Sequence, residues 1–144
     1  MAELAPAVIW VSGLPKKGKS RISDRLKEFG LPVFSTDEFV KRLSEWCPNK
    51  EICKQAENHV PGKIGKFLDT MVHNGKSATI AKLLLDEEHG FSPSHDAPVS
   101  VIEGYMPIPI QQAVMGYLEC MGFYVWVLTR REQFESVCRV PNWR

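Results

Sequence analysis

Residues 8–20 constrain this chain more than any other stretch, because an apolar run there ends in a loop of glycines and lysines. The run Val8-Ile9-Trp10-Val11-Ser12 continues as Gly13-Leu14-Pro15-Lys16-Lys17-Gly18-Lys19-Ser20. The second part matches G-x-x-x-x-G-K-[ST], the pattern of a phosphate-binding loop, at every fixed position. Glycines let the backbone aim several N–H groups at a polyphosphate, where a Cβ would block the close approach. The pattern therefore predicts a site for nucleotide phosphates.

The flanking residues supply the buried strand and the helix that this motif needs before and after it. Ala7–Val11 is uncharged, β-branched and aromatic, which is typical of a central strand in a parallel sheet. Ile22, Leu26 and Phe29 recur at helical spacing, and Gly30 predicts the end of that helix. The context therefore supports the motif over a glycine-lysine surface turn that binds no ligand.

The predicted ligand is a nucleotide polyphosphate with Mg²⁺, and the loop residues fit ATP and GTP equally. Lys19 is expected to reach the β- and γ-phosphates, and the Ser20 hydroxyl is expected to ligate Mg²⁺. Gly18 opens the predicted helix, whose N-terminal amides favour the same anion. The expected nucleotide contacts are Gly13, Leu14, Pro15, Lys16, Lys17, Gly18, Lys19, Ser20 and Arg21.

Composition excludes several other classes of protein. The chain has 144 residues, enough for one domain, and its 44% hydrophobic and 24% charged residues are ordinary for a soluble protein. A net charge of +1 gives no concentrated basic field for nucleic acid. No apolar run approaches the roughly 20 residues that span a bilayer, and no signal peptide is evident, so a cytoplasmic protein is expected. Four cysteines without C-x-x-C spacing argue for reduced thiols over a zinc site.

Strand and helix patterns alternate along the chain. Strands are predicted at residues 31–36, 98–105 and 123–128, the last being apolar throughout and therefore assigned a central place. Helices are predicted at residues 36–47, 64–72, 77–85 and 108–122, with a last one after residue 129; Ser77 is expected to cap its helix and Met121 to face inward. Residues 48–62 read as polar and irregular, with at most a helical turn or two. The alternation predicts an α/β fold, a three-layer αβα sandwich with a mainly parallel sheet, as one domain over residues 1–144.

Two acids follow predicted strands, where ligands bind in an open parallel sheet. Asp37 comes after the second strand, as a functional carboxylate, as the N-cap of the next helix, or as both, since a cap position also holds the carboxylate in place. Glu103 ends the third strand, as a magnesium carboxylate, a group that orients the nucleophile, or an ordinary acid in solvent. Residues 48–90 form a predicted helical insertion for the acceptor. Its candidate contacts for an anionic substrate, together with two from the preceding helix, are Lys41, Arg42, Lys63, Lys66 and His73, which equally fit the exposed faces of helices.

These residues resemble the P-loop kinases of small molecules and polynucleotide ends. The resemblance rests on the phosphate loop, on Ser35-Thr36-Asp37-Glu38-Phe39, which is similar to the aspartate motif of polynucleotide kinase and zeta-toxin-like enzymes, and on Val101-Ile102-Glu103-Gly104-Tyr105. The resemblance implies a P-loop NTPase fold, with Asp37 as general base and Glu103 in the magnesium and nucleophile shell. It also implies that Arg130 and Arg131, after the fourth strand, stabilise the transferred charge. The alternative is that these arginines are solvated side chains of a terminal helix.

The chain departs from this family where a lid and a fifth strand are expected, because it ends soon after the fourth. It is a minimal kinase, a piece of a longer protein, or a kinase-shaped module that depends on a partner. The leading hypothesis is an ATP-dependent transfer of the γ-phosphate to a hydroxyl of a small molecule or a nucleic-acid end. The alternative is a nucleotide-binding regulatory or interaction module without phosphotransfer; an NTPase motor or switch fits less well.

Overall fold

The computed structural model of the chain describes residues 6–12, 28, 30–31, 33–59, 63–94, 96 and 99–128. Over these residues the chain is α/β, as the alternation predicts. They form five helices and four strands. It divides into two compact units. The first consists of the described residues of Met1–Phe34, Pro93–Gly104 and Tyr117–Arg144, and the second of those of Ser35–Ser92 and Tyr105–Gly116. The prediction of a single domain stays a prediction.

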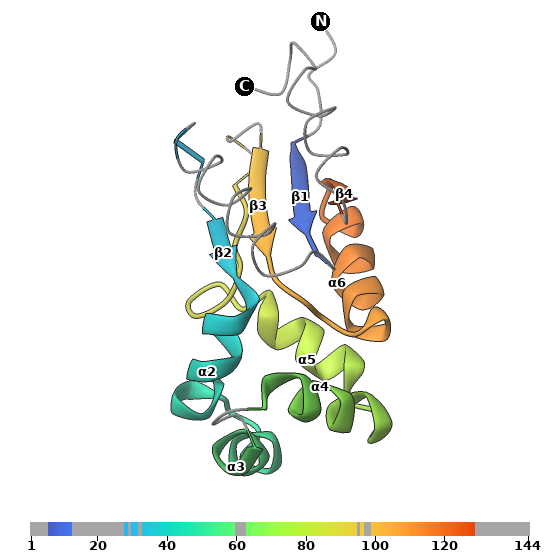
Figure 1. Ribbon diagram of the computed structural model, residues 1–144. Helices are drawn as coiled ribbons and strands as arrows, with labels where there is room; N and C mark the ends of the chain where they lie inside the picture. The colour runs from blue at the N-terminus through green and yellow to red at the C-terminus, as the bar shows by residue number, and fades with distance from the viewer. Residues whose placement is uncertain are drawn as a thin grey trace, which may run out of the picture. The chain divides into compact units, whose positions relative to one another are not determined.

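The sheet has four strands in the order β2-β3-β1-β4 over the described residues. Its members are β1 (Ala7–Val11), β2 (Val33–Ser35), β3 (Val99–Glu103) and β4 (Tyr124–Leu128). β1 pairs in parallel with both β3 and β4 and lies between them (Figure 1). Its buried side chains form a core with those of its neighbours, comprising Ile9, Val11, Val99, Val101 and Leu128. The prediction that the first strand is central is therefore confirmed.

The prediction that the fourth strand is also central is wrong for the described part of the sheet. β4 stands at its end, beside β1 alone. Tyr124 is 62% exposed and Trp126 43% exposed, whereas Leu128 is buried. An unbroken apolar run predicts burial on both faces of a strand, but aromatic side chains at alternate positions can also remain at a surface. Hydrophobicity alone did not distinguish these two cases.

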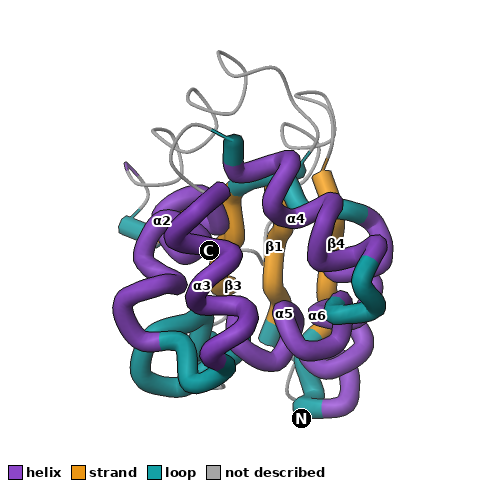
Figure 2. Tube along the Cα trace, turned by 90° about the horizontal axis from the view of Figure 1, so that it is seen from below, coloured by secondary structure: helices purple, strands orange, loops and turns teal. Residues whose placement is uncertain are grey.

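Four helices follow β2 and pack in sequence within the second unit: α2 (Thr36–Trp46), α3 (Lys50–His59), α4 (Ile64–His73) and α5 (Ser77–Leu84). α2 contacts α3 and α4, and α4 contacts both α3 and α5 (Figure 2). The predicted irregular stretch therefore contains a ten-residue helix, α3, of which only Ile52 and Ala56 are buried. None of the described helices has the length and apolar character to cross a bilayer.

Two local predictions about helix ends need correction. The N-cap position of α5 belongs to Lys76, without a side-chain cap bond, and Ser77 is already the first helical residue. α6 spans Ile108–Cys120, so Met121 lies beyond its end and is 47% exposed. The inward face of α6 is built on Ile110, Val114 and Leu118, all fully buried. Helical spacing predicted this face correctly but continued it one residue too far.

Candidate functional site

The carboxyl end of β1 is hydrogen-bonded on both sides within the first unit. Val11 is in register with Glu103 of β3 and with Leu128 of β4. The Gly104 N–H donates to the Val11 carbonyl oxygen at 3.0 Å, and the Ser12 N–H donates to the Leu128 carbonyl oxygen at 2.9 Å. Ser12 is buried and is the last described residue before the predicted phosphate loop. The chain therefore enters that loop from a point held by both neighbouring strands.

Trp10 adds a side-chain bond at the same place. Its side chain is fully buried, and its indole Nε1–H donates to the Gly104 carbonyl oxygen at 3.0 Å. Gly104 has φ of +129°, a backbone conformation that residues with a Cβ rarely adopt. Both backbone polar groups of Gly104 are thus bonded to β1, one through the main chain and one through the indole.

Glu103 is the acid at this edge. It is half-buried at the end of β3, directly beside Val11. Mg²⁺ is commonly held by one or two carboxylates together with substrate phosphate oxygens, so one strand-end carboxylate is a suitable donor. Among the residues that the structure describes, no three His, Cys, Asp or Glu side chains are grouped closely enough to hold a metal without such a substrate.

Most of the predicted nucleotide site falls outside the described residues. This applies to the contacts Gly13, Leu14, Pro15, Lys16, Lys17, Gly18, Lys19, Ser20 and Arg21, and to the arginines Arg130 and Arg131. Of the residues proposed for catalysis, the structure describes Asp37 and Glu103. Their predicted roles stay predictions.

Asp37 lies in the second unit, in the first turn of α2, with an exposed side chain. The alternative that it caps this helix is wrong, because Ser35 is the N-cap. The Ser35 hydroxyl accepts a hydrogen bond from the Glu38 N–H at 3.3 Å, and the chain becomes helical at Thr36. The carboxylate of Asp37 is therefore not needed to satisfy the end of the helix. Its side chain stays available for another role.

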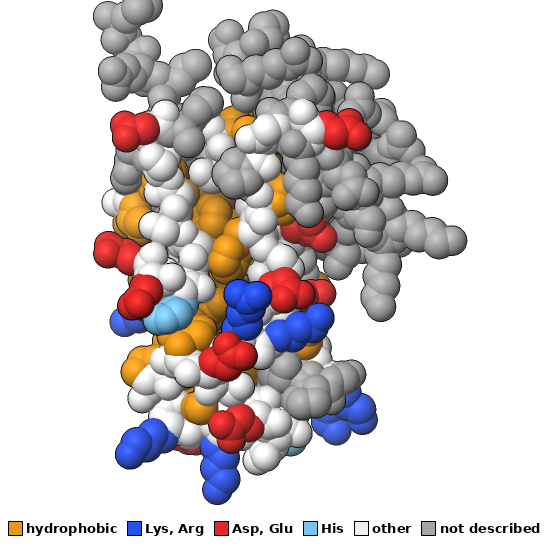
Figure 3. Space-filling view, turned by 90° about the vertical axis from the view of Figure 1, so that its left-hand side faces the viewer, with side chains coloured by type: hydrophobic (Ala, Val, Ile, Leu, Met, Phe, Trp, Pro, Cys, Tyr) orange, Lys and Arg blue, Asp and Glu red, His pale blue; other side chains and the backbone are white. Residues whose placement is uncertain are grey.

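The five candidate contacts for an anionic substrate are all exposed on helices or at a helix start of the second unit: Lys41, Arg42, Lys63, Lys66 and His73. Lys41 Nζ lies 3.6 Å from Glu38 Oε1, in an exposed ion pair between residues about one helical turn apart. Basic side chains are mixed with acidic ones in the lower half of the face shown in Figure 3. Charged side chains on the surface of a helix are ordinarily exposed. The exposure of these five residues therefore does not indicate that they bind one anionic substrate together.

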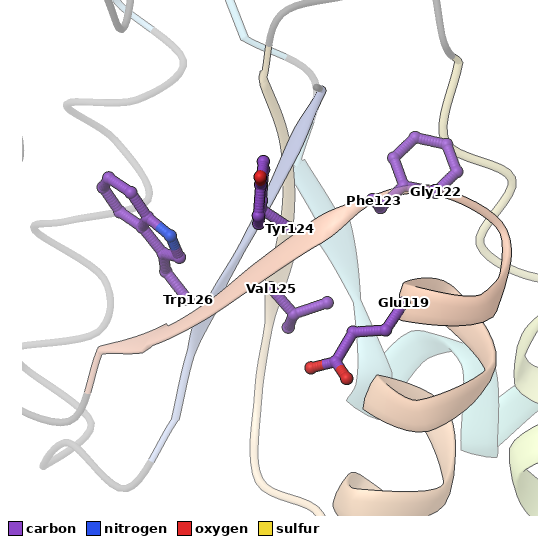
Figure 4. A pocket seen from close by; sticks show the side chains of 6 residues that line it. All are labelled: Glu119, Gly122, Phe123, Tyr124, Val125 and Trp126. Carbon is purple, nitrogen blue, oxygen red and sulfur yellow. The ribbon is translucent and has the colours of Figure 1, made fainter. Parts of the chain in front are cut away.

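A hollow of about 500 Å³ lies beside β4, lined by Glu119, Gly122, Phe123, Tyr124, Val125 and Trp126 (Figure 4). Trp126 points to one side of the strand, and Val125 and Glu119 lie on the other. Tyr124 is in register with Ala7, at the amino end of β1. The hollow is therefore at the opposite end of the strands from Glu103 and is not the predicted nucleotide site.

No protein-family model matches this chain, and no curated protein matches its sequence. The pattern along the sequence placed Gly104 at the end of a strand but missed Trp10 as a member of this edge. An indole within a strand of aliphatic residues could have indicated Trp10, because a buried indole N–H needs an acceptor.

Proposed function

We propose that this chain is an ATP- and Mg²⁺-dependent phosphotransferase that moves the γ-phosphate to a hydroxyl group. We propose further that its parallel sheet is the centre of a three-layer P-loop NTPase fold. Three features support this proposal. The G-x-x-x-x-G-K-[ST] pattern follows β1, Glu103 ends the neighbouring strand β3, and the strand order reverses between β1 and β3.

The order of the strands is the observation that carries the proposal. From β1 the chain passes beyond β3 to form β2, and from β3 it passes beyond β1 to form β4, so these two connections run in opposite directions along the sheet. In open parallel sheets, ligands bind outside the carboxyl ends of strands at such a reversal. The reversal lies between β1 and β3. The predicted phosphate loop follows β1, and Glu103 is the last residue of β3.

Each residue has a separate part in the proposed reaction. Lys19 and the backbone N–H groups of residues 13–20, apart from Pro15, which has none, bind the β- and γ-phosphates, while Ser20 and Glu103 would hold Mg²⁺. When bound, Mg²⁺ neutralises charge on the phosphate oxygens. Asp37 accepts the proton of the acceptor hydroxyl, and Arg130 and Arg131 stabilise charge on the transferred group. Phosphoryl transfer depends mainly on alignment and charge neutralisation, so Asp37 requires no raised pKa.

Calorimetric titration with MgATP tests the nucleotide site. Lys19→Ala removes a charge-assisted hydrogen bond worth about 1.5–3 kcal/mol, so the dissociation constant should rise by roughly 10- to 100-fold. Lys82→Ala is the matched control, because Lys82 is exposed on α5 and has no proposed contact. Equal affinity of wild type and Lys19→Ala, or no binding by wild type, would contradict the proposal.

Phosphotransfer is tested separately from binding. Consumption of ATP should depend on an added hydroxyl compound, and Asp37→Ala should abolish most of that dependence while leaving MgATP affinity unchanged. Candidate acceptors are sugars, nucleosides and oligonucleotides with a free terminal hydroxyl. Tight binding of MgATP with no acceptor-dependent consumption for any of them would indicate the nucleotide-binding module instead.

A further inference from the structure

The bond from Trp10 to Gly104 joins residues that are 94 positions apart in the chain. It is formed where β3 ends. The Gly104 N–H still bonds to the Val11 carbonyl oxygen of the neighbouring strand. The φ of +129° at Gly104 then turns the chain away from an extended course. The next acceptor, the Gly104 carbonyl, is bonded by the indole of Trp10.

Trp10 is the one residue of β1 whose side chain carries a hydrogen-bond donor. Val8, Ile9 and Val11 are as deeply buried in the same strand without any side-chain donor. A buried carbonyl oxygen has to be hydrogen-bonded, and the donor here comes from β1 itself. The bond therefore fixes the direction in which the chain leaves Glu103. Its acceptor directly follows this acid, and its donor lies in the strand that leads into Ser12 and the predicted phosphate loop.

We infer that Trp10 is a positioning residue of the proposed site, which holds Gly104 and through it the Glu103 carboxylate beside the start of the phosphate loop. This inference rests on the proposed function, because Glu103 matters here as a magnesium carboxylate. The hydrogen-bonded groups that orient a metal ligand affect metal affinity strongly, typically by about 10- to 100-fold. Trp10 acts one step further away, through the backbone. Loss of its N–H should cost about 10-fold in the Mg²⁺-dependent part of nucleotide binding.

The measured quantity is the gain from Mg²⁺, which is the dissociation constant for ATP in EDTA divided by that for ATP with Mg²⁺. Trp10→Phe removes the donor and keeps an aromatic ring. Replacement of Trp10 by 3-benzothienylalanine, in which sulfur takes the place of the N–H, keeps the bicyclic shape if the Phe variant fails to fold. Either replacement should lower the gain about 10-fold. The affinity for ATP in EDTA should stay unchanged, because the phosphate loop still starts from the Ser12 bond to Leu128.

A double-mutant cycle shows whether Trp10 acts through Glu103. Glu103→Gln should lower the gain as well, and the double variant Trp10→Phe/Glu103→Gln should be no worse than Glu103→Gln alone. Trp126→Phe is the control, since Trp126 lies in β4 of the same sheet and is 43% exposed. It should leave both dissociation constants unchanged.

The outcomes separate this inference from the proposed function. If wild type binds MgATP, Lys19→Ala binds it more weakly, and both Trp10 replacements keep the full gain, the positioning role is wrong and the function stands. The positioning role is also wrong if the replacements weaken ATP binding equally with and without Mg²⁺, because that is a general structural effect. If wild type binds no nucleotide, both are overturned.

Discussion

Gly90 stands in the turn after α5, where a side chain would collide with the backbone. A Cβ at this position would overlap the Leu84 carbonyl oxygen and lie 2.7 Å from the Leu84 carbonyl carbon and 2.9 Å from the Asp86 nitrogen. Two backbone hydrogen bonds close this turn. The Gly90 N–H donates to the Asp86 carbonyl oxygen at 2.9 Å, and the Phe91 N–H donates to the Leu84 carbonyl oxygen at 2.6 Å. Gly90→Ala should therefore force this turn to open.

The size of the effect follows from these contacts. Insertion of a methyl group into a packed site costs about 1–3 kcal/mol. Weakening two backbone hydrogen bonds adds about 1 kcal/mol for each. We expect the free energy of unfolding to fall by about 3–5 kcal/mol. At about 2–4 °C per kcal/mol for a chain near this size, Tm should drop by roughly 6–20 °C.

Gly116→Ala is the matched control with the opposite sign. Gly116 lies inside α6 and is exposed, and a Cβ there would meet no atom within 4 Å. Alanine is favoured over glycine in a helix by about 1 kcal/mol, so this variant should be stabilised. Thermal and urea unfolding followed by circular dichroism measure both variants. A Gly90→Ala protein as stable as wild type would refute the described path of this turn.

Two further predictions concern titratable side chains of the chain. Hydrogen bonds from the backbone N–H groups of His89, at 3.0 Å, and of Glu88, together with the His89 ring, lower the pKa of Asp86. The stabilisation from this carboxylate is present above its unfolded pKa of about 3.9 and is lost as pH falls through its lower folded value. The Tm difference between wild type and Asp86→Asn should thus shrink below about pH 4, and a constant difference down to about pH 2.5 would contradict this. Burial raises the pKa of the Cys47 thiol, so iodoacetamide at about pH 8 should label it more slowly than the exposed Cys120. Peptide mass spectrometry gives both rates, and faster labelling of Cys47 would show that its thiol is not protected.

Strongly patterned elements could be predicted from the sequence because their signals are local. β1 has the predicted bounds, and α4 ends at His73, one residue beyond the predicted range 64–72, just before Gly75 at φ of +72°. α3 was missed because only Ile52 and Ala56 are buried in it, too few to show a helical repeat of apolar residues. This helix is stabilised by its contact with α2, which the local sequence does not reveal. Asn49 was the available signal. Its side chain accepts a hydrogen bond from the Ile52 N–H at 3.1 Å, as an N-cap residue does.

The site could be predicted only in part, for a related reason. Residue types at strand ends identified Glu103 and Asp37 as candidates, and the glycine-lysine motif identified the predicted loop. The assignment of Asp37 as a cap failed by two residues, because Ser35 can make the same bond and the chain becomes helical earlier. Nothing in the spacing of polar residues indicated Trp10, whose partner Gly104 is distant in the sequence.

The sequence by itself determined most of the segments that form strands and helices in this chain, with α3 as the exception, and which polar residues follow the strands. Periodicity and capping act over a few residues, so the chain carries that information locally. Only the tertiary structure decided which strands are neighbours. β3, and not the earlier β2, lies against β1, so Glu103 is the acid in register with Val11. A hydrophobic pattern indicates that a strand is buried, but it does not indicate which strands lie beside it. The choice of neighbour depends on contacts between residues far apart in the chain.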